Sequence, residues 1–198
     1  MINNIDQIKT LLKFDSEDDF YHLQILKRKK EHPELGSNSY VVKTYYVRSL
    51  EYLDKIFPEV VSICNFHNAR ACINLNRRSF EKIAFHTLKK VTDCILNKDY
   101  KSVKKAYESV CGSYSNESEH KWIIDVDNKD GLHLYIAEKI RKFEPDPGES
   151  KVITYIETKN GWHIITKPFN TSNFRIHTEM NGQVCEIHKN NPTILYIP

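Results

Sequence analysis

The amino-acid sequence predicts an α+β fold in a single compact domain of 198 residues. Hydrophobic residues at helical spacing predominate in residues 1–119. Alternating apolar and polar residues predominate in residues 120–198, where an Asn160-Gly161 pair separates two such segments and indicates a β-hairpin. No long linker interrupts the chain, so we expect an N-terminal α/β unit packed against a C-terminal antiparallel sheet.

Local signals place the individual elements. Hydrophobic spacing and capping residues predict helices over residues 4–13 and 17–30, from Ser49, from Pro58 to 66, from Ser79 to 95, over 100–110 and over 132–143, the last capped by Asp130. The acids at the start of 17–30 and the lysines at its end suit a helix dipole. Alternation and β-branched or aromatic residues predict strands over 40–47, 70–76, 121–127, 152–157, 162–166, 183–188 and 193–197. The C-terminal part therefore has the order β-α-β-β-β-β, in a layer with one sheet face free.

Composition excludes several classes of protein. Hydrophobic residues make up 40% and charged residues 28% of the chain, values typical of a globular domain. The longest apolar runs are far too short to cross a bilayer, and the N-terminus lacks the pattern of a secretory signal. We therefore expect a cytoplasmic protein without a membrane partner. A formal net charge of +3 does not by itself identify a partner.

The five cysteines indicate neither a disulfide framework nor a zinc site. Their number is odd, and they lie far apart in the sequence. Cys64 and His67 are three residues apart, but no second pair with ligand spacing completes a zinc site. We interpret the cysteines as reduced thiols that are buried or half buried.

Basic side chains are concentrated between residues 77 and 105. This stretch holds nine of them and three acids; the nine are Arg77, Arg78, Lys82, Lys89, Lys90, Lys98, Lys101, Lys104 and Lys105. Such a stretch is able to follow a phosphate backbone. An ordinary solvated helical face explains it equally well.

Two carboxylates stand on one face of the strand expected over 121–127. Asp125 and Asp127 are two residues apart, so they project from the same face about 7 Å apart along the backbone. The two charges repel each other unless a divalent cation lies between them, and their oxygens suit Mg²⁺ or Mn²⁺. An exposed strand end that runs into a turn is the simpler explanation of the pair taken alone.

Two further segments carry candidate site residues. After the Asn160-Gly161 turn, His163 and Lys167 share one strand face and are able to bind a triphosphate, although a half-buried histidine is the commoner fate of such a residue. Glu186 lies in a short strand, on the same side as His188, and could complete a cation site.

These segments together resemble the archaeo-eukaryotic primase superfamily, including primase-polymerases of phages and plasmids. Its Asp-x-Asp motif is matched by Asp125 and Asp127. The segment from Thr158 to His163 resembles its Ser/Thr-x-His motif, although the residue two positions before His163 is Gly161, where the family has Ser or Thr. Its third motif, a hydrophobic residue followed by an acid, is matched by Cys185-Glu186.

The resemblance covers mainly residues 120–198 and implies the fold and the chemistry of this part. It implies that residues 120–198 form a catalytic palm with an RRM-like sheet, and that residues 1–119 form the accompanying helical and α/β unit. It implies that Asp125, Asp127 and Glu186 bind two Mg²⁺ or Mn²⁺ ions on the open sheet face, for nucleotidyl transfer. His163 would contact the phosphates of the incoming nucleotide, with help from Lys167. Contacts to template or triphosphate are further assigned to Arg70, Arg77 and Arg78.

The resemblance also implies partners. These are nucleoside triphosphates and a single-stranded DNA template. We expect no helicase region or helical primer-binding extension after the third motif, and we therefore expect a separate helicase or replication protein as a partner.

Other functions remain open. A non-catalytic module that binds single-stranded nucleic acid would keep the basic stretch and lack metal and nucleotide binding. A metal-dependent nuclease would use the same three acids. A replication-initiator nickase is disfavoured, because it requires two histidines that flank a hydrophobic residue, and the sequence has no such triplet.

Overall fold

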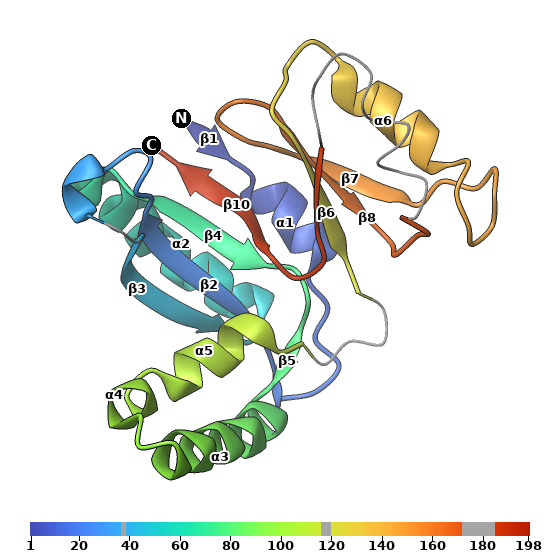
Figure 1. Ribbon diagram of the computed structural model, residues 1–198. Coiled ribbons are helices and arrows are strands. Elements are labelled where there is room, and N and C mark those ends of the chain that lie inside the picture. Colours follow the sequence, from blue (N-terminus) through green and yellow to red (C-terminus); the bar gives the residue numbers. More distant parts are fainter. Residues whose placement is uncertain (37–38, 116–119, 172–184) are drawn as a thin grey trace.

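Two antiparallel β-sheets form the framework of the computed structural model, which describes residues 1–36, 39–115, 120–171 and 185–198 (Figure 1). The first sheet contains, in spatial order, β1 (Ile2–Asn3), β10 (Pro192–Ile197), β4 (Arg70–Asn74), β2 (Asp19–Lys27) and β3 (Tyr40–Val47), and β5 (Arg78–Ser79) pairs with the start of β2. The second sheet contains β7 (Val152–Glu157), β8 (Trp162–Thr166), β6 (Trp122–Val126) and β9 (Glu186–His188). The predicted α+β class is confirmed.

Helices cover both sheets. In the described residues they are α1 (Ile5–Leu11), α2 (Leu50–His67), α3 (Phe80–Leu96), α4 (Tyr100–Val103), α5 (Ala106–Ser113), α6 (Leu132–Ile140) and the 3-10 turn η1 (Pro33–Leu35). Figure 1 shows α6 on the side of the second sheet that faces away from the first sheet, and α3–α5 grouped at the other end of the molecule. Ser49 and Ser79 cap α2 and α3 as predicted, because each hydroxyl accepts a backbone N–H of the first turn.

The main hydrophobic core joins the two sheets. The first sheet and α1 and α2 contribute residues such as Leu23, Ile73 and Leu53, and the second sheet contributes Ile123 and Ile165. A smaller core lies between the second sheet and α6. Both faces of the second sheet are therefore packed. The prediction of one free face is wrong, because Ile123 of β6 and Ile165 of β8 enter the main core from one face, while Ile124 and Ile164 pack toward α6 from the other.

Residues 19–27 form strand β2, so the prediction of a helix over residues 17–30 is wrong. Tyr21, Leu23 and Ile25 enter the main core, whereas Phe20 on the opposite face packs with α3 and α5. A central strand that is buried on both faces has consecutive apolar residues, and its periodicity is not distinguishable from that of a buried helix. The acids at the start of the segment and the lysines at its end are also the arrangement that suits a helix dipole, so they favoured the wrong prediction.

Pro58 lies inside α2 and does not start a second helix. Leu53 and Ile56 before it and Val60 and Cys64 after it are all buried on one face. Burial of this continuous face offsets the hydrogen bond that a proline cannot donate. Two further boundaries also differ from the prediction: residues 100–110 form two short helices, and α6 has Gly131 as its N-cap residue in place of Asp130.

The strand at residues 192–197 belongs to the first sheet, although we expected it beside its predecessor in the C-terminal layer. β9 is in the second sheet, and the chain then crosses to place β10 between β1 and β4. Asn76 secures this crossing: its amide donates to the carbonyls of Lys121 and Lys189 and accepts the N–H of Lys121 at 2.7 Å. The two sheets are thus connected by the chain and by side-chain hydrogen bonds.

Within the described ranges, no helix combines the length and the apolar character needed to span a bilayer.

Candidate active site

Three of the predicted site residues lie side by side on neighbouring strands of the second sheet. Asp125 in β6 is paired with His163 in β8 on one side and with Glu186 in β9 on the other. Residues directly opposite each other in antiparallel strands project from the same face, so these three side chains form one row. The motifs are separated in the sequence, and the strand register brings them together.

The hairpin between β7 and β8 fixes the position of His163. The turn closes through the N–H of Thr158, which donates to the carbonyl of Gly161, and through the N–H of Gly161, which donates to the Thr158 hydroxyl at 3.1 Å. Gly161 packs against the end of β6, where an added Cβ would lie 1.9 Å from the carbonyl oxygen of Val126. The glycine therefore allows the hairpin to approach the strand that carries Asp125.

His163 is a neutral, oriented imidazole. Its side chain is 13% exposed, its Nδ1 lies 2.8 Å from the Thr193 hydroxyl, and its Nε2 lies 3.6 Å from Oδ1 of Asp125. Burial, assisted by the positive charges of His188, Arg70 and Arg28, lowers its pKa to about 4. Because a carboxylate only accepts, the favoured tautomer has Nε2–H facing Asp125 and Nδ1 accepting from Thr193.

The surroundings of Asp125 destabilise its ionised form. Burial raises its pKa, and the charges of Asp127 and Glu186 raise it further, against opposing effects of His188 and Arg28. A carboxylate destabilised by burial and by two like charges gains from a nearby cation. The donor set consists of carboxylate oxygens, which are the ligands that Mg²⁺ and Mn²⁺ prefer.

Asp127 and Glu186 are less constrained than Asp125. Asp127 follows β6 and is exposed. The side chain of Glu186 is 71% exposed, and its Oε2 lies 3.4 Å from Nε2 of His188. In the part of the chain that the structure describes, no group of three or more His, Cys, Asp or Glu side chains is arranged to hold a metal ion. The three acids therefore lie near one another, but they do not form a complete coordination shell for a metal ion.

Arg70 lies in β4 of the first sheet, and its positive charge reaches the site. The side chain is buried, and its Nη2 donates to Oε1 of Glu31. Its charge contributes to the lowered pKa of His163. The same Glu31 oxygen lies 3.3 Å from Nζ of Lys159, in the turn before β8.

Lys167 is not brought to these residues. It follows β8 at the end where Thr166 pairs with Trp122, whereas His163 pairs with Asp125 at the other end. Four residues along a strand correspond to about 13 Å, so sharing a strand face does not place Lys167 near His163. The lysine on the side of the site is Lys159, which belongs to the same hairpin.

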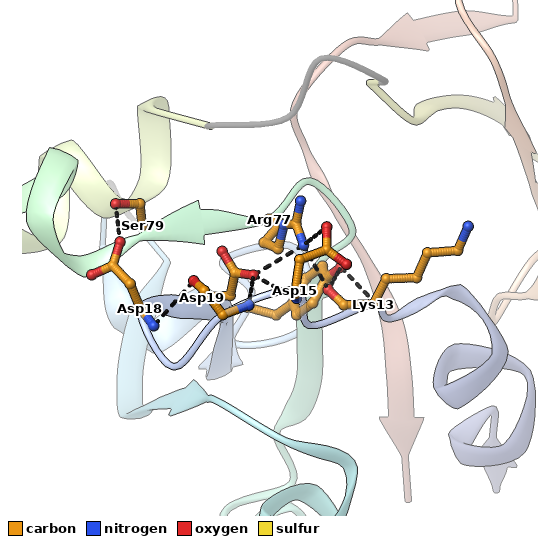
Figure 2. A network of polar contacts seen from close by, with 8 residues as sticks. Lys13, Asp15, Asp18, Asp19, Arg77 and Ser79 are labelled. Atoms are coloured by element: carbon orange, nitrogen blue, oxygen red, sulfur yellow. Dashed lines mark hydrogen bonds and ion pairs between the residues drawn. The ribbon is translucent and has the colours of Figure 1, made fainter.

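The two arginines at residues 77 and 78, which were assigned to template or triphosphate, make contacts within the fold. Figure 2 shows Arg77 between Asp15 and Asp19, with Nη1 at 2.6 Å and 3.0 Å from their carboxylates. Arg78 is completely buried and donates to the backbone carbonyls of Cys111 and Asn76. These contacts fix the connection from β4 to α3. The exposed cations of the basic stretch are lysines, including Lys89, Lys101, Lys104 and Lys105.

Sequence reasoning missed four residues that act on the row of Asp125, His163 and Glu186 directly or are linked to it through Arg70. They are Arg28, Glu31, Lys159 and Thr193. Lys159 lies inside the hairpin motif, and its position there was the one available signal. The contact of Thr193 with His163 is not predictable from the sequence, because it depends on the crossing of β10 into the first sheet.

Comparison of the chain with protein-family models, with curated proteins and with solved structures finds no match.

Proposed function

We propose that the chain is a template-dependent nucleotidyltransferase of the primase-polymerase type, which makes short RNA or DNA from nucleoside triphosphates. The observation that carries the proposal is the strand register, which places Asp125 between His163 and Glu186. A carboxylate with a raised pKa, further acids and a neutral imidazole on adjacent strands suit metal-assisted phosphoryl transfer.

The topology of the second sheet supports the proposal. Its elements follow one another as β6, α6, β7, β8 and β9, and its spatial order is β7-β8-β6-β9. This is the order of a split β-α-β motif, which is also that of RRM-like sheets. The resemblance of the sequence motifs to primases and the strand order are independent observations, because the motifs alone do not determine which strands are neighbours.

The roles of the residues follow from their positions. Asp125, Asp127 and Glu186 would hold Mg²⁺ or Mn²⁺, which supplies activation of the attacking 3′-hydroxyl and neutralisation of the leaving pyrophosphate. His163, held by Thr193, presents an N–H toward Asp125. As a neutral donor it binds a phosphate oxygen without a proton transfer, and its contribution is positioning.

The decisive experiment supplies a single-stranded template, mixed nucleoside triphosphates and Mg²⁺ or Mn²⁺, and detects short labelled products. The double variant Asp125→Ala with Asp127→Ala should make no product and should bind the template at least as well as the wild type, because two negative charges are removed. The matched control removes two exposed acids elsewhere, Asp6→Ala with Glu17→Ala, and should retain synthesis. Synthesis by the Asp125/Asp127 variant would contradict the mechanism.

A catalytically inactive single-strand-binding module is the second candidate. The observation that favours it is Glu186, which is mostly exposed and paired with His188 in place of a closed cluster with Asp125. Template binding by a wild-type chain that makes no product with either metal and a supplied primer would favour this candidate. Strand cleavage in the same assay would instead indicate a nuclease that uses the same acids.

A further inference from the structure

Glu31, in the turn after β2, lies between two cationic side chains from different parts of the fold. Its Oε1 accepts from Nη2 of Arg70 in the first sheet and lies 3.3 Å from Nζ of Lys159 in the second. Burial raises the pKa of Glu31, but the charges and hydrogen bonds of Arg70 and Lys159 outweigh burial and hold the pKa below its usual value. Glu31 is therefore an ionised carboxylate that bridges the two cations.

The carboxylate leaves Arg70 incompletely paired. The Arg70 side chain is 8% exposed, and its Nε has no hydrogen-bond partner among the described residues. Nε and Nη2 form one edge of the planar guanidinium, which matches an oxyanion that presents two oxygens. Glu31 uses Nη2 alone, so a buried donor remains available on that edge.

The surroundings favour a more highly charged anion than one carboxylate. Arg28 and Arg70 both act on His163, so their charges lie on the side of the candidate active site. Arg70 and Lys159 both contact the single charge of Glu31. A phosphate group has a larger charge and more acceptor oxygens, and is able to accept from Nε and Nη2 together.

We propose that Arg70 and Lys159 bind a phosphate group of the incoming nucleoside triphosphate, and that Glu31 occupies this place until the phosphate displaces it. The identification of the ligand as a nucleotide rests on the proposed function. Glu31 satisfies a buried arginine in the absence of ligand and lowers the affinity for anions that are too weak to displace it. The turn that carries Glu31 moves toward solvent when the phosphate enters.

The first test measures the binding of inorganic tripolyphosphate to the full chain by calorimetry, in chelator and without template. Glu31→Gln removes the competing charge and retains an oxygen that accepts from Arg70; it should bind about tenfold more tightly than the wild type. Glu34→Gln removes the same charge three residues away, where the side chain is exposed, and should match the wild type. Equal affinity of Glu31→Gln and wild type, or no binding by either, would overturn the proposal.

The second test uses the wild type alone, so it does not depend on the folding of a variant. Backbone amides of residues 28–32 should exchange faster with deuterium when tripolyphosphate is bound, and unchanged exchange would overturn the displacement. A 5′-hydroxyl oligonucleotide replaces tripolyphosphate in a further arm. If Glu31→Gln tightens only oligonucleotide binding, the phosphate belongs to a strand and the assignment to a nucleotide is wrong.

Neither measurement requires synthesis. A chain that binds tripolyphosphate as expected and makes no product would contradict the proposed nucleotidyltransferase activity and leave the displacement of Glu31 intact.

Discussion

The carbonyl oxygen of Val126 occupies the space into which a side chain at Gly161 would project. A Cβ at residue 161 would lie 1.9 Å from this oxygen and 2.6 Å from the backbone nitrogen of Asn128. Both atoms belong to backbone and have little freedom to move. The closeness of hairpin and strand is what places His163 opposite Asp125.

Gly161→Ala should therefore destabilise the protein by about 3 kcal/mol, because the added methyl group forces backbone apart. Gly112→Ala is the matched control: an added Cβ there meets no atom within 4 Å, and alanine favours the helix α5. The control should lose no stability. Urea unfolding of both variants measures the difference, and equal stability would show that the hairpin tolerates displacement.

Asp125→Asn should raise the thermal stability of the metal-free protein at neutral pH. The folded state raises the pKa of Asp125, chiefly through burial, so the ionised form that prevails above the unfolded pKa costs stability; the uncharged amide removes this cost. Mn²⁺ should stabilise the wild type, by about 2.7 kcal/mol at a concentration of 100 times Kd, and should not stabilise the variant. Thermal unfolding with and without Mn²⁺ checks both effects. Equal stabilisation by Mn²⁺ would place the cation elsewhere.

Stability should depend on pH through His163. Its folded pKa of about 4 is below the unfolded value of 6.5, so the unfolded chain binds a proton that the folded chain lacks. The stability conferred by the neutral imidazole is complete above pH 6.5 and is lost as the pH falls toward 4, to an extent of about 3 kcal/mol. His163→Asn should lack this component. Denaturant unfolding of both proteins between pH 4 and 7.5 tests the expectation, and parallel profiles would refute it.

Asn76→Ala should cost about 2 kcal/mol, because it leaves the backbone groups of Lys121 and Lys189 without their side-chain partner. Asn97→Ala, at the exposed end of α3, serves as the control and should change stability by less than about 0.5 kcal/mol. Chemical unfolding measures both. A small effect of Asn76→Ala would mean that the main core alone holds the sheets together.

The lysines of α3–α5 are expected to bind single-stranded DNA. Binding should weaken with salt by a log–log slope of about 0.7 per phosphate contacted, and replacement of Lys89, Lys90, Lys104 and Lys105 by Glu should flatten the slope. Lys90 also donates to Ser109, so the triple variant without Lys90→Glu is the control for helix packing. Fluorescence anisotropy at several salt concentrations provides the measurement. An unchanged slope would mean that these lysines do not contact DNA phosphates and contribute only to solubility.

Local signals predicted the parts of the site that lie within one hairpin or one strand. The Asn160-Gly161 turn and the alternation around Asp125 are readable because neighbouring residues determine them. Contacts between distant segments are not readable in this way: Arg70 and Glu31 are 39 residues apart, and Glu31 and Lys159 are 128 apart. The position of Lys167 is a different case, because its separation from His163 is four residues along the chain and follows from strand spacing alone.

The fold was predictable to a similar extent. Ser49 and Ser79 identified the starts of two helices because a cap is a local hydrogen bond. The segment that forms β2 was misassigned because burial on both of its faces depends on partners elsewhere in the chain.

The place of β10 has a consequence for the order of events during synthesis. Residues 192–197 lie between β1 and β4, so the first sheet lacks an interior strand until these residues have left the ribosome. Until then β4 has one unpaired edge and β1 has no partner strand in the sheet, although most of the sheet has already been translated. Such long-range pairing slows folding and exposes an aggregation-prone edge. The first sheet is therefore completed only when residues 192–197 pair with both β1 and β4, after every other strand of that sheet has been translated.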